Sequence, residues 1–338
     1  MSDTPEIPSE FYFQWDITDV CNNRCKHCYH ETYENTRQLD CSKLLKIADN
    51  IEDALSKWGF CGNLSVTGGE PFTRANDLYM ILRHLDECDH IGSYDILTNG
   101  TLLGEKEIFT LQSLKKLRRI QVSLEGSTAE LHDFVRGDGD FQKVISAIRL
   151  LKAHGFTVSV MTTLTNNNRN DLPKILDLLA TLDVDYFALE RFMPEGQGDH
   201  HHAWVVGKEE LRDTFAYMTE QAFKIKKPHL LLYRTLYCLC SDNETVGAMC
   251  SAGVSALTIL PDGTLLPCRR LPIPIGNIFT NGIIDTWYNS EVLWNLRNYS
   301  SYKGKCGSCE HILRCRGCRS MAYALTGDYL EEDPQCWK

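Results

Sequence analysis

Residues 11–28 read FYFQWDITDVCNNRCKHC, a β-rich run that leads directly into three closely spaced cysteines. Aromatic and β-branched residues dominate Phe11–Thr18, as is typical of a buried strand. Cys21, Cys25 and Cys28 then follow with the spacing CxxxCxxC. The stretch therefore predicts a strand whose carboxyl end carries a group of metal ligands.

Strands and helices alternate from this point to about residue 191. Further strands are expected at Asn63–Thr67, Tyr94–Thr98, Ile120–Leu124, Thr157–Leu164 and Tyr186–Glu190. Helices are expected between them at Ser42–Trp58, Asp77–Asp86, Glu105–Leu117, Phe141–His154 and Leu172–Leu182. Asp40 and Asp171 precede the first and last of these helices and are expected to be N-caps. This α/β alternation predicts parallel strands in a partial (β/α)6 barrel, with an open doubly wound sheet as the alternative.

The pattern changes after residue 207, and three regions are expected: a barrel at 11–207, a linker at 208–249 and a small α+β domain at 250–338. The linker contains a predicted helix at Lys208–Lys226. In the last region Val254–Leu260 and Thr264–Leu266 flank the turn Pro261-Asp262-Gly263, which predicts a hairpin. A single helix is expected at Ile284–Arg297.

Composition excludes several classes of partner. The 338 residues carry a formal charge of −10, whereas nucleic-acid binding needs a positive surface. No apolar run reaches the ~20 residues that span a bilayer. Residues 1–10 do not resemble a secretory signal, and 15 cysteines is an odd number for a disulfide framework. We therefore expect a cytoplasmic protein without nucleic-acid or membrane partners, whose cysteines bind metal.

The first three cysteines permit two kinds of metal site. Three thiolates can hold a 4Fe–4S cubane and leave one iron free for a small molecule, as catalytic metal sites leave an open position. Alternatively, His27 or His30 could complete a zinc site.

The stretch CNNRCKHC resembles the cluster signature of the radical S-adenosylmethionine (SAM) superfamily. The resemblance implies a 4Fe–4S cluster bound by SAM, whose reduction yields a 5′-deoxyadenosyl radical that abstracts hydrogen from a substrate. It also implies a reductant such as flavodoxin or ferredoxin. His27 stands where many relatives have an aromatic residue close to the adenine.

Other motifs in the same region resemble the family's SAM contacts. Gly68-Gly69-Glu70-Pro71 resembles the element that binds the SAM amino group, and glycine there lets the backbone approach a ligand closely. Ser123 and Glu125 resemble the ribose-binding element, although many relatives have aspartate in place of Glu125. Arg136 resembles an arginine that faces the SAM carboxylate, with an exposed arginine as the alternative. Thr98 and Asn99 are expected at the floor of this pocket.

Seven further cysteines are enough for nearly two four-ligand clusters, and paired zinc sites are the alternative. They are Cys250, Cys268, Cys306, Cys309, Cys315, Cys318 and Cys336. Their spacing resembles the SPASM domain, which implies one or two auxiliary iron–sulfur clusters. The resemblance assigns Cys306, Cys309, Cys315 and Cys336 to an outer cluster, and Cys250, Cys268 and Cys318 to an inner one.

The inner cluster then lacks an evident fourth ligand. Cys240 or Cys238 could supply it, or one iron stays open. Cys238 could alternatively donate a hydrogen atom to a substrate radical. Glu190 and Arg191 end the sixth predicted strand, where they either contact substrate or form a structural ion pair. His200, His201 and His202 are expected in an exposed loop rather than a metal site.

The SPASM resemblance implies modification of a ribosomal peptide or protein as the leading function. Recognition of that peptide is expected to need a separate protein or the segment Met193–Val206, because the first motif begins at residue 21. The ending Gly317–Leu330 with Asp333-Pro334 resembles enzymes of heme d1 and alternative heme pathways, which act on propionate side chains of iron tetrapyrroles. A zinc-stabilised binding protein without enzymatic activity is the third hypothesis.

Overall fold

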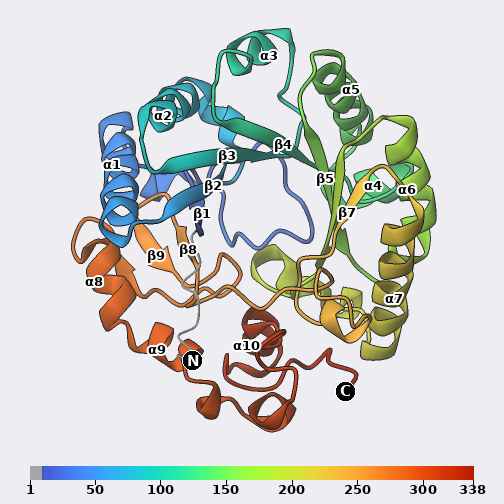
Figure 1. Cartoon of the computed structure of the whole chain (residues 1–338). Helices are drawn as coiled ribbons and strands as arrows, with labels where there is room; N and C mark the ends of the chain where they lie inside the picture. Colours follow the sequence, from blue (N-terminus) through green and yellow to red (C-terminus); the bar gives the residue numbers. More distant parts are fainter. Residues whose placement is uncertain (1–9) are drawn as a thin grey trace.

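A ten-stranded sheet forms the centre of the molecule in this computed structural model, which describes residues 10–338. The strand order is β10-β9-β8-β1-β2-β3-β4-β5-β6-β7, and the helices surround its outer face (Figure 1). The parallel strands of the first part are β1 Glu10–Asp16, β2 Cys61–Thr67, β3 Ile91–Thr98, β4 Leu117–Ser123, β5 Val158–Leu164, β6 Tyr186–Arg191 and β7 His229–Leu231. The partial α/β barrel and its six predicted strands are confirmed, and β7 is an addition. The expectation for residues 1–9 lies outside the described part of the chain.

The helices of the barrel agree with the sequence except at a few points. They are α1 Cys41–Trp58, α2 Ala75–Glu87, α3 Glu105–Leu111, α4 Ala129–Arg136, α5 Asp140–Ala153, α6 Leu172–Thr181 and α7 Lys208–Lys224. The short α4 was not expected from the sequence. The expected extension of α3 to Leu117 is wrong, because the carboxylate of Asp86 accepts the N–H groups of Lys115 and Lys116 at 2.9 Å and fixes them in an irregular connection.

The two predicted N-caps differ. Asp40 accepts a hydrogen bond from the N–H of Lys43 at 3.0 Å, so this cap is confirmed. Asp171 stands at the N-cap of α6 but makes no capping bond. Its carboxylate instead accepts from the N–H and the hydroxyl of Ser127, at 2.6 and 2.8 Å, and so ties α6 to the loop after β4.

Alternation along the strands separates a hydrophobic outer face from a polar inner face. Phe11, Phe13 and Trp15 of β1 are buried, and the Phe11 ring lies 5.0 Å from that of Trp58 in α1. Tyr12 and the other intervening residues face inward. The loop between β1 and α1, in blue, runs across the middle of the ring of strands (Figure 1). Polar groups and this loop therefore meet inside the barrel.

The C-terminal part is joined to the barrel through the same sheet. Its elements are β8 Ala256–Ile259, β9 Thr264–Leu266, β10 Gly276–Asn277, α8 Gly282–Asn289, α9 Glu291–Arg297 and α10 Arg319–Thr326. The predicted hairpin is confirmed as antiparallel β8 and β9, and β8 pairs in parallel with β1. The single helix expected at Ile284–Arg297 is wrong, because Ser290 breaks it and caps α9 by accepting from the N–H of Leu293 at 3.4 Å. None of the helices in residues 10–338 is long and apolar enough to cross a membrane.

Candidate active site

Cys21, Cys25 and Cys28 lie in the loop after β1, at the carboxyl end of the parallel strands. The backbone N–H groups of Asn23 and His30 each lie 3.4 Å from a sulfur, that of Cys21 and that of Cys28 respectively. Such N–H groups favour a thiolate over a thiol. Burial nevertheless raises the pKa of Cys21 to about 12, so a metal must displace the proton when it binds.

Two glycines hold this loop against the end of β2. The N–H of Gly69 donates to the carbonyl of Thr18 at 2.7 Å. A Cβ at Gly68 would lie 2.4 Å from the oxygen of Thr18, and one at Gly69 would lie 2.3 Å from the oxygen of Val20. The structure places both glycines against the backbone that leads into Cys21, and their contact with a ligand stays a prediction.

Glu70 joins the ends of β2 and β3. Its fully buried carboxylate accepts from the hydroxyl of Thr98 at 2.8 Å and from the N–H groups of Asn99 and Phe72 at 2.7 and 3.2 Å. Burial raises its pKa to about 7 despite these donors. The Asn99 amide lies 4.0 Å from the sulfur of Cys21, so Glu70 positions residues beside the cysteines rather than facing them itself.

Glu125 pairs with two other residues for which the sequence predicts SAM contacts. One carboxylate oxygen lies 3.1 Å from His27 Nε2 and accepts from Arg136 Nε at 3.1 Å, while the other accepts from the N–H of Thr163 at 2.8 Å. Burial alone would raise the pKa of Glu125, but Arg136 and His27 hold it well below its usual range. Arg136 Nη1 also lies 3.9 Å from the sulfur of Cys25, so its positive charge is next to the triplet.

Pro71 and Ser123 complete the set of predicted SAM contacts. Pro71 is buried and begins a short 3-10 helix that follows Glu70. Ser123 is the last residue of β4, and the face that it shares with Gln121 is the inner one. Both residues therefore lie at the same end of the barrel as the cysteine triplet.

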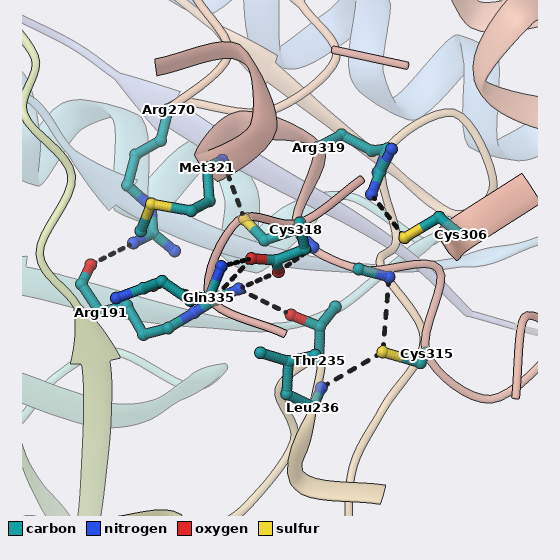
Figure 2. A network of polar contacts seen from close by, with 12 residues as sticks. Arg191, Thr235, Leu236, Arg270, Cys306, Cys315, Cys318, Arg319, Met321 and Gln335 are labelled. Atoms are coloured by element: carbon teal, nitrogen blue, oxygen red, sulfur yellow. Dashed lines mark hydrogen bonds and ion pairs between the residues drawn. The ribbon is translucent and has the colours of Figure 1, made fainter. Parts of the chain in front are cut away.

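Four C-terminal cysteines line one small cavity. They are Cys306, Cys309, Cys315 and Cys336, the four that the sequence assigns to an outer cluster. The N–H groups of Leu236 and Gly317 lie 3.3 and 3.4 Å from the sulfur of Cys315, and Arg319 Nη2 lies 3.4 Å from that of Cys306 (Figure 2). The cavity therefore combines thiols with donors aimed at their sulfurs.

The inner cluster is expected to have only three cysteine ligands, Cys250, Cys268 and Cys318. Cys318 accepts from the N–H of Met321 at 3.4 Å, and the N–H of Cys250 donates to the carbonyl of Cys315 at 3.1 Å. The two candidates for a fourth ligand have other neighbours: the thiol of Cys238 lies near that of Cys315, and that of Cys240 lies near Thr219 in α7. The fourth ligand, or an open iron in its place, stays a prediction.

Comparison with known proteins agrees with both groups of cysteines. The profile of the radical SAM superfamily matches residues 15–179, and that of the SPASM iron–sulfur cluster-binding domain matches residues 250–318. An AdoMet-dependent heme synthase of Methanosarcina barkeri is 30% identical to this chain over 95% of each protein. This chain belongs to the radical SAM superfamily.

Two further comparisons support the same family and fold. The mycofactocin maturase MftC of Mycobacterium tuberculosis is 29% identical over 95% of this chain and 81% of its own length. The crystal structure of Streptococcus suis SuiB bound to its precursor peptide SuiA superposes with a TM-score of 0.78 and 18% identity, over 97% of this chain and 76% of SuiB. The radical SAM domain binds a 4Fe–4S cluster and SAM, and the SPASM domain binds auxiliary iron–sulfur clusters. The hypothesis of a zinc-stabilised binding protein is therefore wrong.

The lining of the SPASM cavity fits an iron–sulfur cluster. The thiolates that hold a cubane bind different irons around a shared volume, and Cys306, Cys309, Cys315 and Cys336 all line this one cavity.

Glu190 and Arg191 leave the end of β6 in different directions. The guanidinium of Arg191 binds both carboxylate oxygens of Asp333 at 3.1 and 2.9 Å, and also Gln335 and Thr235 at 3.0 and 3.1 Å (Figure 2). This buried ion pair ties the radical SAM barrel to the SPASM tail and favours the structural alternative for Arg191. Glu190 instead pairs with two arginines on the inner face, Arg234 and Arg270.

The histidine run lies in a 3-10 segment, Gly196–Trp204, where the sequence predicts a loop. His202 contacts Asp199 at 3.0 Å, and His201 stacks on Trp204 with ring centroids 4.2 Å apart.

Sequence reasoning missed several residues around the site. The guanidinium of Arg24 lies over the ring of Tyr33 at 4.3 Å, and that of Arg269 lies over the ring of Tyr29 at 4.2 Å. The only signal for Arg269 and Arg270 was their position directly after Cys268. No spacing in the sequence indicated Tyr33 or Arg234.

Proposed function

We propose that this radical SAM enzyme modifies the propionate side chains of an iron tetrapyrrole. The observation that carries the proposal is the 30% identity with an AdoMet-dependent heme synthase along 95% of both chains, which includes the radical SAM and the SPASM regions. The resemblance of the tail at residues 317–334 to heme-pathway enzymes supports the same substrate. The sequence alone ranks a ribosomal peptide ahead of a tetrapyrrole as the substrate, and this similarity reverses that order.

In this proposal Cys21, Cys25 and Cys28 hold the cluster that binds SAM. The bound cofactor supplies a 5′-deoxyadenosyl radical, which abstracts hydrogen from the substrate. Arg136 compensates thiolate charge beside Cys25, and Glu125 fixes the orientation of Arg136 and His27.

Hydrogen bonds and backbone contacts within the chain hold the rest of the pocket in place. Glu70 holds Thr98 and Asn99 at the end of β3, and the glycine pair holds the cysteine loop. These contacts are preorganised within the protein, so they place the ligands of the cluster before a substrate arrives.

The SPASM cysteines would hold the auxiliary clusters. Cys306, Cys309, Cys315 and Cys336 are proposed for the outer one, because they line a single cavity. Cys250, Cys268 and Cys318 are proposed for the inner one, with an open iron. Hydrogen bonds to sulfur raise the reduction potential of such clusters, so the donors at Cys315 and Cys306 would ease their reduction.

The test is anaerobic reconstitution followed by turnover. We expect about 11–12 irons per chain for three clusters, against roughly 8 for two. Reduced protein with SAM and an iron tetrapyrrole that has propionates should yield 5′-deoxyadenosine together with a tetrapyrrole of altered mass. Cleavage of SAM with no change in any propionate-bearing iron tetrapyrrole would exclude this substrate class.

A ribosomal peptide is the second candidate, favoured by the 29% identity with mycofactocin maturase MftC over 95% of this chain. It predicts that a short precursor encoded beside this gene is modified when both are coexpressed. Mass spectrometry of that peptide, with and without the three N-terminal cysteines, checks this. If the precursor peptide stays unmodified while the tetrapyrrole is altered, the substrate is the tetrapyrrole and not the peptide.

A further inference from the structure

We propose that Arg234 and Arg270 form a binding site for a substrate carboxylate on the inner face of the barrel, and that Glu190 occupies this site when substrate is absent. This inference rests on the proposed function and specifies which part of the substrate the chain recognises. The shared chemistry is a carboxylate, whether from a tetrapyrrole propionate or from an acidic peptide.

The geometry places both guanidinium groups on one carboxylate. Arg234 contacts Glu190 Oε1 and Arg270 contacts Glu190 Oε2. Glu190 shares the inner face of β6 with Tyr186, over whose ring the guanidinium of Arg119 lies. Arg270 also donates to the carbonyl of Arg191 at 3.2 Å, which fixes it beside the sheet (Figure 2). The two arginines thus converge on a position where a single carboxylate fits.

Exposure distinguishes this group from a structural ion pair. The Glu190 side chain is only 9% exposed, whereas those of Arg234 and Arg270 are 40% and 26% exposed. The Arg191–Asp333 pair is 7% and 0% exposed. The guanidinium groups at Glu190 can therefore be reached by a ligand, and those of the structural pair cannot.

Charge inside the barrel also favours an anionic ligand. Ion pairs there include Arg119 with Asp95, Arg269 with Asp16, and Arg234 and Arg270 with Glu190. In these pairs four arginines face three carboxylates, although the whole chain has a net charge of −10. The guanidinium groups of Arg234 and Arg270 repel each other, and an additional carboxylate would relieve this repulsion.

One other carboxyl group lies near these arginines and compensates little of their charge. Burial raises the pKa of Glu195 to about 7, against the opposing effect of Arg270 and Arg269. Glu195 is therefore partly protonated at neutral pH. Its Oε1 is buried without a hydrogen-bond partner among the described residues.

The site lies between the two groups of cysteines. Arg269 stacks on Tyr29, the residue after Cys28, and Arg270 comes two residues after Cys268. A substrate held by its carboxylate at Arg270 would lie within the space that both cofactor regions border.

The experiment measures binding to the reconstituted holoenzyme with bound SAM. The probes are iron coproporphyrin III, which has four propionates, and its tetramethyl ester, which has none. The variants are Arg234→Gln, Arg270→Gln and the control Arg212→Gln, an exposed arginine of α7 that pairs with Glu209. We expect the Kd of the free acid to rise roughly tenfold or more in R234Q and R270Q, because each loses a charge-assisted bond. R212Q should bind as the wild type does.

A further variant separates recognition from structure. Glu190→Gln removes the internal competitor, so it should bind the free acid more tightly than the wild type. If R234Q, R270Q and E190Q all weaken binding together, the three residues are structural and the proposal is overturned. Equal binding of acid and ester by the wild type, or unchanged binding by R234Q and R270Q, would overturn it as well.

A second arm identifies the source of the carboxylate. Hexaglutamate and hexaglutamine replace the porphyrin and its ester, and arginine-dependent binding of hexaglutamate alone indicates an acidic peptide. The readout is binding, so it does not depend on turnover. Arginine-dependent binding of the porphyrin without its conversion would refute the proposed function and leave this site standing.

Discussion

Glu125 is the residue on which most of the contacts around the triplet converge. His27, Arg136 and the backbone of Thr163 all contact its carboxylate, which is buried. Removal of one member of such a pair leaves the other charge buried without compensation, and this costs more than the pair itself contributes. Arg136 would then face only Cys25.

We therefore expect Glu125→Gln to lower the free energy of unfolding of the cluster-free protein by about 3 kcal/mol at pH 7. Because the folded-state pKa of Glu125 lies below the unfolded value, its contribution is present above about pH 4.3 and is lost as pH falls. Urea unfolding at pH 7 and at about pH 3, more than one unit below the unfolded pKa, measures this loss. Glu209→Gln, at an exposed pair, should change stability little. A loss for E125Q that is equal at both pH values would contradict the assignment.

Glu70 has the opposite dependence on pH. Its folded-state pKa of about 7 lies above the unfolded value, so the folded state binds this proton more tightly and stability falls as pH rises from about 4.3 to 7. In Glu70→Gln this part of the pH dependence should disappear. Thermal unfolding from pH 5 to 8 compares the two proteins, and parallel curves would show that Glu70 does not titrate in this range.

The cysteine ligands could be predicted because their spacing is local in the sequence. The partners of Glu70 and Glu125 could not, because they depend on which strands are neighbours and on the register between them. Arg191 is an example. The sequence correctly predicts that it ends a strand, but it could not predict the partner Asp333, which lies 142 residues away.

Close contact between elements, more than their intrinsic propensity, positions the cysteine loop. The end of β2 carries Gly68 and Gly69, which touch the backbone of Thr18 and Val20. The types and order of the strands followed from alternation, whereas the end of α3 and the break at Ser290 depended on hydrogen bonds made in the folded chain.

Gly69→Ala should displace this loop. The new Cβ would lie 2.3 Å from the carbonyl oxygen of Val20, and backbone cannot yield as a flexible side chain does. We expect a loss of about 1–3 kcal/mol in the free energy of unfolding and a weaker N-terminal cluster. The control is Gly104→Ala, whose Cβ would be 3.4 Å from its nearest neighbour. Iron content and urea unfolding of both variants provide the test, and normal cluster content in G69A would contradict it.

Over the whole molecule, several connections join the barrel to the SPASM region, among them a strand pairing and a buried ion pair. One is the sheet, through the pairing of β8 with β1. The other is the buried Arg191–Asp333 pair, in which Asp333 also accepts from the N–H of Cys318 at 2.8 Å. The division into separate regions at 207 and 250 remains a prediction.

Asp333→Asn should remove the buried ion pair between Asp333 and Arg191. It leaves Arg191 buried without its counter-charge, so we expect a loss of about 3 kcal/mol in the free energy of unfolding. The signals of the auxiliary clusters in electron paramagnetic resonance should change, because the N–H of Cys318 loses a charged acceptor. Asp285→Asn, at an exposed position, is the control. Unchanged stability and spectra in D333N would show that the pair contributes neither.

The pairing of β8 with β1 has a consequence for any attempt to shorten the protein. A fragment that ends before residue 250 would leave β1 as an edge strand, with the backbone groups of Tyr12–Trp15 open to pairing with another copy. Such a fragment should therefore aggregate, and its insolubility would say nothing about whether its cysteines can bind a cluster.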